Sequence, residues 1–171
     1  LSISDEVIVL NSFSKYFSMT GWRLGWMVLP PALVGVADRL AANLYICPSV
    51  PAQHAAVAAF DASAELDGHV RRYAHNRRIV LDGLDAAGIT QRSSADGAFY
   101  VYADTGHLAA DSTQLCAAWL DELGVAATPG VDFDPRRGGR FVRFSFAGAT
   151  ADMAEAMALD RKSTRLNSSH T

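Results

Sequence analysis

The chain has few cysteines, no long apolar run and no excess of positive charge. Its 171 residues include two cysteines, Cys47 and Cys116, which are too few and too far apart for a disulfide framework or a cysteine-rich metal site. No apolar stretch approaches the ~20 residues that cross a bilayer, and the N-terminus lacks the pattern of a signal peptide. A formal charge of −3 provides no basic stripe for nucleic acid. We therefore expect a cytoplasmic protein without membrane or nucleic-acid partners.

The sequence is rich in apolar residues, which make up 50% of the chain. At this length they can form the core of one ordinary domain or of two small ones. The apolar patterns predict strands at 7–10, 24–29, 98–102 and 141–146 and helices at 31–44, 52–60, 66–87, 112–123 and 151–159. The first strand is a short β-branched run, which is typical of a central strand in a parallel sheet. Gly88 is placed to end the long helix, and Thr150 to cap the last one.

The pattern changes along the chain and predicts three parts. Residues 1–62 combine β-branched strands with apolar helices, and residues 63–159 hold a long helix followed by the short strands and helices of a small α+β domain. Residues 160–171 lack apolar periodicity and resemble the in-frame translation of a sequencing adapter, so we expect a non-native tail there. Because the first strand follows Leu1 so closely, we expect a piece of a longer protein.

The loop between the first two strands carries the residues best suited to chemistry. It reads Ser-Phe-Ser-Lys-Tyr-Phe-Ser-Met-Thr-Gly-Trp-Arg, and such strand-end loops hold the sites of α/β folds. Apolar and cationic neighbours shift a lysine such as Lys15 toward the neutral amine that attacks a carbonyl. The hydroxyls of Ser12 and Ser14 and the guanidinium of Arg23 can hold a phosphate. A Schiff-base lysine beside a phosphate site indicates pyridoxal 5′-phosphate as the cofactor. The alternative, which is common for a lysine in a loop, is that Lys15 is only a solvated surface charge.

The loop closely resembles the lysine motif of the class I/II aminotransferases, which are fold-type-I pyridoxal-phosphate enzymes. The resemblance implies an α/β fold, in which a remnant of the cofactor-binding large domain precedes a smaller α+β C-terminal domain. It implies that Lys15 forms the Schiff base and moves a proton, and that Ser12, Ser14 and Arg23 bind the cofactor phosphate. An α-amino acid and a 2-oxo acid are the implied substrates, and a homodimer is the implied assembly of the full-length protein.

A second candidate, Arg143, lies in the apolar segment Phe-Val-Arg-Phe-Ser-Phe. A buried guanidinium without a partner is costly, so we expect Arg143 to meet an anion. From the residues alone, Arg143 either pairs with a protein carboxylate or lies on a strand face that is open to water. The family resemblance implies instead that Arg143 binds the α-carboxylate of the substrate. The spacing of the histidines predicts no metal site.

The resemblance also shows what these residues lack. Such enzymes need a glycine-rich phosphate loop, an aromatic on the cofactor ring, and an Asn and an Asp that contact the ring, and all of these normally precede the lysine strand. We therefore expect this chain to be inactive alone. Alternatives on the same fold are a lyase, a decarboxylase, a synthase, or the aminotransferase-like sensor domain of a transcriptional regulator. A non-catalytic α/β binding domain is the remaining alternative.

Overall fold

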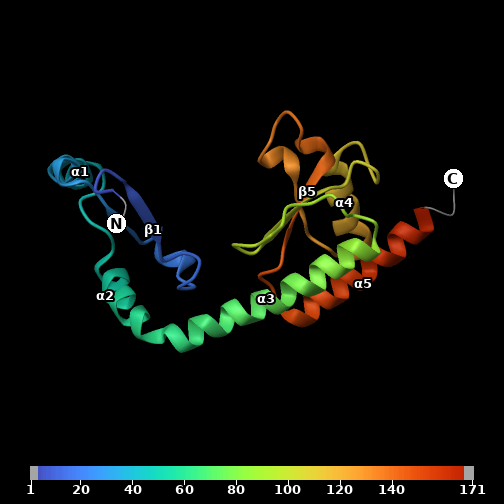
Figure 1. The fold of residues 1–171 in the computed structure, drawn as a ribbon, viewed down its shortest axis with the longest axis horizontal. Helices are drawn as coiled ribbons and strands as arrows, with labels where there is room; N and C mark the ends of the chain where they lie inside the picture. The colour runs from blue at the N-terminus through green and yellow to red at the C-terminus, as the bar shows by residue number, and fades with distance from the viewer. Residues whose placement is uncertain (1–3, 168–171) are drawn as a thin grey trace. The chain divides into compact units, whose positions relative to one another are not determined.

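A computed structural model describes the backbone of residues 4–167 and the side chains of residues 4–159. The chain divides into two compact units, Leu1–Val70 and Arg71–Thr171. The long helix α3, Ser63–Ala86, spans this division (Figure 1). Each unit is described by itself below.

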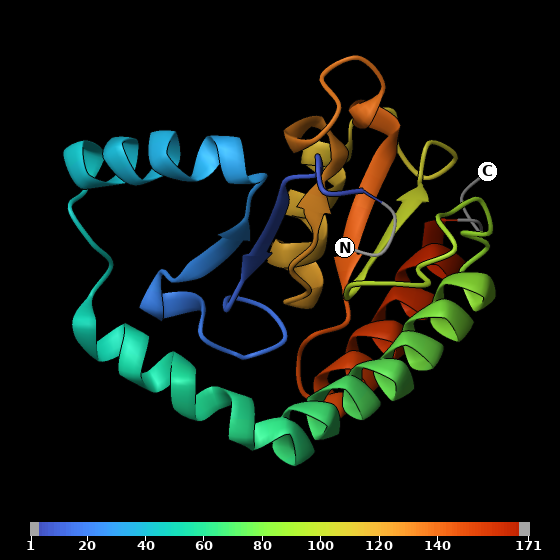
Figure 2. The same cartoon turned by 60° about the vertical axis from the view of Figure 1, so that its left-hand side comes forward.

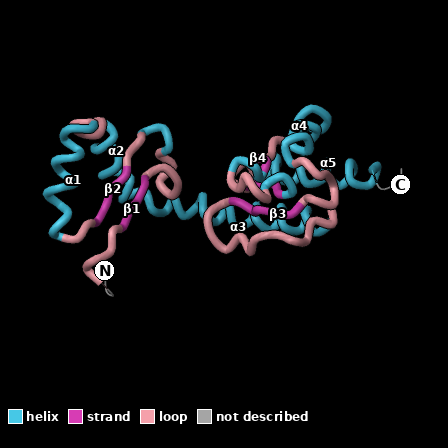
Figure 3. The backbone as a smooth tube through the Cα atoms, turned by 90° about the horizontal axis from the view of Figure 1, so that it is seen from above, coloured by secondary structure: helices cyan, strands magenta, loops and turns pink. Residues whose placement is uncertain are grey.

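The first unit contains one β-hairpin, seen as the two adjacent strands in Figure 3. Strand β1, Val9–Ser12, pairs antiparallel with β2, Gly25–Val28. The sequence pattern predicted a parallel strand at 7–10, so both the position and the pairing differ. The reason is the connection: a single loop turns the chain back between the strands, whereas a parallel pair needs a crossover segment, usually a helix.

Two helices follow the hairpin. Helix α1, Pro31–Leu44, begins at a proline, which fits the first turn because its missing N–H would have no helical partner there. Helix α2 covers Val50–Ala59, close to the predicted range of 52–60. Helix α1 has no buried residue, although its apolar residues recur at helical spacing. Its apolar stripe is therefore open to solvent among the described residues.

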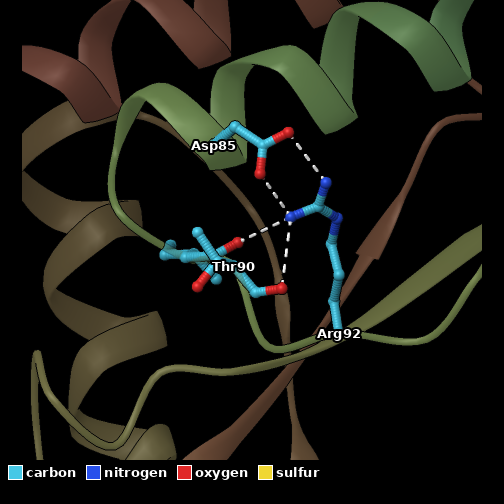
Figure 4. Close-up of polar contacts among 4 residues, drawn as sticks. Asp85, Thr90 and Arg92 are labelled. Carbon is cyan, nitrogen blue, oxygen red and sulfur yellow. Dashed lines mark hydrogen bonds and ion pairs between the residues drawn. The ribbon is translucent and has the colours of Figure 1, made fainter.

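Helix α3 ends where the sequence predicted. Gly88 adopts a left-handed φ of 80°, which glycine tolerates at a helix C-terminus. Beyond it, Arg92 binds back to the last turn of the helix in a bidentate ion pair with Asp85, at 2.6 and 2.8 Å (Figure 4). Arg92 Nη1 also donates to the carbonyl oxygens of Ile89 and Thr90. These contacts fix the chain between α3 and the sheet that follows.

The second unit is built on a three-stranded antiparallel sheet with strand order β3-β5-β4. Strands β3, Tyr100–Asp104, and β5, Phe141–Ser145, pair so that Tyr102 lies opposite Arg143. The third strand, β4, is only Thr128–Pro129, and Thr128 also lies opposite Arg143. Two residues pair before the chain enters a 3-10 helix, because β5 offers them a free edge.

One face of this sheet is buried under three helices. These are the C-terminal part of α3, α4 (Ser112–Leu123) and α5 (Thr150–Asn167), and Figure 2 shows α3 and α5 side by side. A Cβ on Gly83 of α3 would meet the Met157 side chain of α5, so these helices approach closely at that point. The fully buried core includes Val80, Leu84, Ile89, Val101, Ala103 and Val142. This core holds the opposite sheet face, with Arg143, in place.

The last helix departs from two expectations. Thr150 is its first residue rather than its cap, and its hydroxyl donates to Oδ1 of the fully buried Asn76 at 2.8 Å. The helix also continues to Asn167, beyond the predicted end at residue 159. The side chains of the expected non-native tail, 160–171, lie outside the described residues. Among the helices described, none has the length and apolarity that crossing a membrane requires.

Candidate active site

The lysine loop, defined as residues 12–24, begins at the last residue of β1, continues the β-hairpin and is anchored by one buried ring. Phe13 N donates to Leu24 O at 3.0 Å, which extends the ladder beyond the strands. The Phe13 side chain is 5% exposed and packs with Met19 and Ala56. Its ring lies 4.7 Å from Phe17 and 4.9 Å from Trp26 between centroids. Because Phe13 points inward, its neighbours along an extended chain point outward.

The two predicted serines are these outward neighbours of Phe13. Ser12 is exposed and Ser14 is half-buried. Ser14 N donates to Ser12 Oγ at 3.0 Å, a local turn that holds the two residues in a fixed relation. Thr20 Oγ1 donates to Ser14 O at 2.5 Å and closes the loop across its width. The loop therefore presents two hydroxyls from a backbone that is tied down.

Arg23 occupies a conformation that is unfavourable for any residue with a side chain. Its φ is 51° and its ψ is 50°, in the left-handed region, at the end of the 3-10 helix Thr20–Trp22. Such a residue costs roughly 1–3 kcal/mol, and such strain concentrates at functional sites. The side chain is exposed, and Nη1 donates to Thr20 O at 2.8 Å. The guanidinium is thereby held against the loop, with most of its five N–H donors left for an anion.

Lys15 sits at the turn of the lysine loop. Its carbonyl accepts from Ser18 N at 3.0 Å, and its side chain is exposed. The sequence argument expected apolar and cationic surroundings for this amine. Among the described residues, the side chain keeps much of its contact with water, so the apolar enclosure is not provided there. The amine is accessible to a carbonyl compound.

Two further contacts tie the lysine loop to the start of α3, and sequence reasoning missed both. Tyr16 Oη donates to Asp67 Oδ1 at 2.8 Å, and Ser18 Oγ lies 3.1 Å from His69 Nδ1. The hydrogen bond to Asp67 raises the pKa of Tyr16. Both bonds join residues 51 positions apart, and no local pattern marks such a pair.

Arg143 lies in the second unit, on the sheet face opposite the core. Its Cζ is 4.2 Å from the ring centroid of Tyr100 and 4.5 Å from that of Phe133. Its Nη2 donates to Thr128 Oγ1 at 3.3 Å. Within the described residues, Nε is buried without a hydrogen-bond partner, and no carboxylate forms an ion pair with Arg143. The alternative of an ion pair with a protein carboxylate is therefore not seen among the described residues, and the site has spare donors for an external anion.

Two acidic residues of the second unit, Asp104 and Asp134, are paired with other arginines. Asp134 accepts from the backbone N–H groups of Arg137 and Arg136 and from Arg137 Nε, and these bonds lower its pKa. Asp104 pairs with Arg140 at 2.6 Å, which lowers its pKa. Arg137 and Arg140 thus engage these two carboxylates. Among the described residues, no carboxylate forms an ion pair with Arg143.

Tyr100, Thr128 and Phe133 are the neighbours of Arg143 that sequence reasoning did not assign. Strand alternation placed Tyr100 and Tyr102 on one face, and this was a usable signal. Phe133 lies in a loop, and nothing in its local sequence indicates that its ring stacks on Arg143. The lysine loop and Arg143 belong to different units of the chain.

Comparison with known proteins identifies a family. The family model described as aminotransferase class I and II matches residues 1–159. A valine–pyruvate aminotransferase of Mycobacterium tuberculosis is 51% identical over 156 residues, covering 90% of this chain and 40% of the relative. An aspartate aminotransferase of Sulfurisphaera tokodaii is 34% identical over 157 residues, covering 90% of this chain and 39% of the relative.

A solved structure agrees with these matches. The crystal structure of an aminotransferase from Mycobacterium tuberculosis has a TM-score of 0.93 to this chain at 48% identity, covering 96% of this chain and 43% of that one. This match confirms the predicted fold class. The chain spans about 40% of the length of the curated relatives it matches. The chain belongs to the class I and II aminotransferase family.

Proposed function

We propose that this chain contributes the lysine and phosphate-binding residues of a pyridoxal-phosphate-dependent aminotransferase. The observation that carries the proposal is the lysine loop, which presents Ser12, Ser14, Lys15 and Arg23 from one tied-down hairpin. The reaction would move an amino group between an α-amino acid and a 2-oxo acid in two half-reactions. The whole protein would act in the cytoplasm as a homodimer, without nucleic-acid or membrane partners.

The phosphate of the cofactor would be held by Ser12, Ser14 and Arg23. The fit rests on the outward serines beside the inward Phe13 and on the strained backbone of Arg23. Hydroxyls and guanidinium N–H groups are strong donors to phosphate oxygens, and arginine adds a permanent positive charge. Strain at Arg23 is explained if the position of its guanidinium matters more than the stability of the loop.

Lys15 would carry both the link to the cofactor and the proton transfer. When bound, pyridoxal phosphate supplies an electron sink for the charge that develops at the substrate α-carbon. Lys15 Nζ would hold the cofactor and would act as the base that takes the proton from the substrate α-carbon. A positioned base of this kind contributes about a hundredfold to ten-thousandfold in rate.

Arg143 would bind the α-carboxylate of the substrate. Its Nη groups offer planar donors that match a carboxylate, and the buried Nε has no protein partner among the described residues. The absence of a protein carboxylate partner among the described residues supports this role. The named relatives are aminotransferases, which favours transamination over a lyase, decarboxylase or synthase reaction and over a sensor role.

The test uses the full-length protein that contains this chain. Lys15 is the only lysine among residues 1–159, so peptide mapping after borohydride reduction has one possible target in this part of the chain. We expect the cofactor on Lys15, and Lys15→Arg should lower kcat about a hundredfold or more. Arg39→Lys, which places a new lysine at an exposed position of α1, is the control: it should take no label at residue 39 and should keep turnover.

The substrate pair is tested in the same preparation. We expect 2-oxo acid formation from an amino acid panel that starts with valine and pyruvate, the pair named for the 51% identical relative. Release of ammonia or carbon dioxide in place of a 2-oxo acid would identify one of the other reactions. A protein that takes no label at Lys15 would reject the proposal.

A further inference from the structure

The guanidinium of Arg143 is held by aromatic rings rather than by a counter-charge. Its Cζ lies 4.2 Å from the Tyr100 centroid and 4.5 Å from the Phe133 centroid. The two rings come from different segments, Tyr100 from β3 and Phe133 from the end of the 3-10 helix Gly130–Asp132. We propose that Tyr100 and Phe133 form an aromatic clamp that makes the Arg143 site selective for planar carboxylates over tetrahedral oxyanions. This inference rests on the proposed role of Arg143 in substrate binding.

The clamp holds the cation without using its hydrogen-bond donors. A cation over an aromatic face is attracted by the ring electrons, and this attraction leaves every N–H group available. A carboxylate partner would occupy two donors, and no such partner is present among the described residues. Only Nη2 is engaged, by Thr128 Oγ1 at 3.3 Å, while Nε is buried and unpaired in the described part of the chain. The arrangement preserves in-plane donors for a ligand.

Both rings are fixed by the fold around them. Tyr100 is the first residue of β3 and pairs with Ser145 of β5. Phe133 N donates to Gly130 O at 3.0 Å. A Cβ on Gly138 would come within 2.3 Å of the Gly130 backbone, so the two ends of this loop are in tight contact. Phe133 is nevertheless 49% exposed, so replacing it should leave the core intact.

The clamp restricts the shape of the anion. A carboxylate can bind both oxygens in the plane of the guanidinium, along its N–H edge. A phosphonate has a third oxygen outside that plane, which would approach one of the two rings. Contact between an oxyanion and the negative face of an aromatic ring is unfavourable. We infer that the rings penalise the tetrahedral anion and favour the planar one.

The experiment measures discrimination in the full-length enzyme. The probes are valine, or the panel's amino acid substrate if it differs, and the aminophosphonate analogue of the same amino acid as a competitive inhibitor. We expect Phe133→Ala to raise KM for the amino acid about fivefold, with kcat changed less than about twofold. The inhibition constant of the phosphonate should stay level or fall. The ratio of this inhibition constant to the KM of the amino acid should therefore drop at least about fivefold.

Three further variants separate the explanations. Phe133→Tyr keeps a ring and should retain the discrimination, and Tyr100→Leu should weaken it as Phe133→Ala does. Leu120→Ala, at a 54% exposed position on α4, is the matched control for loss of surface apolar area and should change neither constant. Equal weakening of the binding of both ligands in Phe133→Ala and Tyr100→Leu would overturn the clamp and leave the two rings a structural role.

Arg143→Gln tests the proposed function separately. An unchanged KM for the amino acid in this variant would reject the carboxylate site itself.

Discussion

At the scale of single residues, Arg92 shows how one side chain secures the junction after a helix. It is mostly buried, with a side chain that is 17% exposed, and it binds both oxygens of Asp85. The same guanidinium satisfies backbone carbonyls beyond the end of α3 (Figure 4). Such a bidentate pair fixes geometry as well as charge. The pair therefore fixes the path of the chain as it leaves the end of α3 toward β3.

This pair predicts a pH dependence of stability. The hydrogen bond from Arg92 lowers the pKa of Asp85. A lowered folded-state pKa contributes stability above the unfolded aspartate pKa of about 4, and this contribution is lost as pH falls through the folded value. The Asp85→Asn variant should therefore have a lower free energy of unfolding than the wild type near neutral pH. As the pH falls into the acid range, the free energy of unfolding should decrease less in this variant than in the wild type.

Denaturant unfolding across this pH range is the measurement. Asp82→Asn is the control, because Asp82 is an exposed aspartate one turn earlier on α3 without an ion pair among the described residues. Parallel acid profiles for the wild type and Asp85→Asn would contradict the assignment.

At the scale of elements, the hairpin depends on a glycine that faces the partner strand. Gly25 lies opposite Ser12, and a Cβ there would come within 2.5 Å of the Asn11 carbonyl oxygen. Backbone atoms cannot retreat as a flexible side chain can. Gly25→Ala should therefore displace β2 from β1 and destabilise the first unit by about 1–3 kcal/mol. Because Ser12 moves with this pairing, cofactor affinity should fall as well.

Gly21 provides the matched comparison. A Cβ at Gly21 would meet nothing within 4 Å, so Gly21→Ala introduces the same methyl group into the segment between the strands of the same hairpin without a clash. Thermal unfolding and cofactor titration of both variants in the full-length protein check the prediction. Similar losses in the two variants would show that the close approach at Gly25 is not the cause.

At the scale of the whole molecule, the two units differ in how much apolar surface they bury. The second unit has a core of fully buried side chains such as Leu84, Val101 and Val142. The first unit leaves large apolar side chains open, including Leu10 at 72%, Leu44 at 76% and Ile46 at 81% exposure. Apolar patches of this extent mark surfaces that bind another protein surface or cause aggregation.

This difference predicts unequal protection in the 171-residue chain studied alone. Amide hydrogen exchange should be slowest in β3, β5 and the C-terminal part of α3, where side chains are buried on one face. The hairpin and α1 should exchange quickly, and the chain should bind a hydrophobic dye and self-associate. Equal amide protection in both units, in a monomer that binds no hydrophobic dye, would contradict this prediction.

The sequence by itself determined the helices and the chemistry-bearing loop. The helices at 31–44 and 112–123 match α1 and α4, because helical periodicity and terminal Pro and Gly signals act over a few residues. The family was also recognisable from the loop that contains Lys15 and Arg23, since that motif is contiguous. The roles of these residues stay predictions, tested by the experiments above.

Only the tertiary structure decided the pairing of strands and the surroundings of the arginines. A strand of four residues carries no record of its partner's direction, so the antiparallel β1–β2 pair was missed. The rings on Arg143 come from β3 and from the loop after β4, and the left-handed turn at Arg23 follows from closure of the hairpin. Contacts between residues far apart in the sequence depend on the whole fold, and local patterns do not encode them.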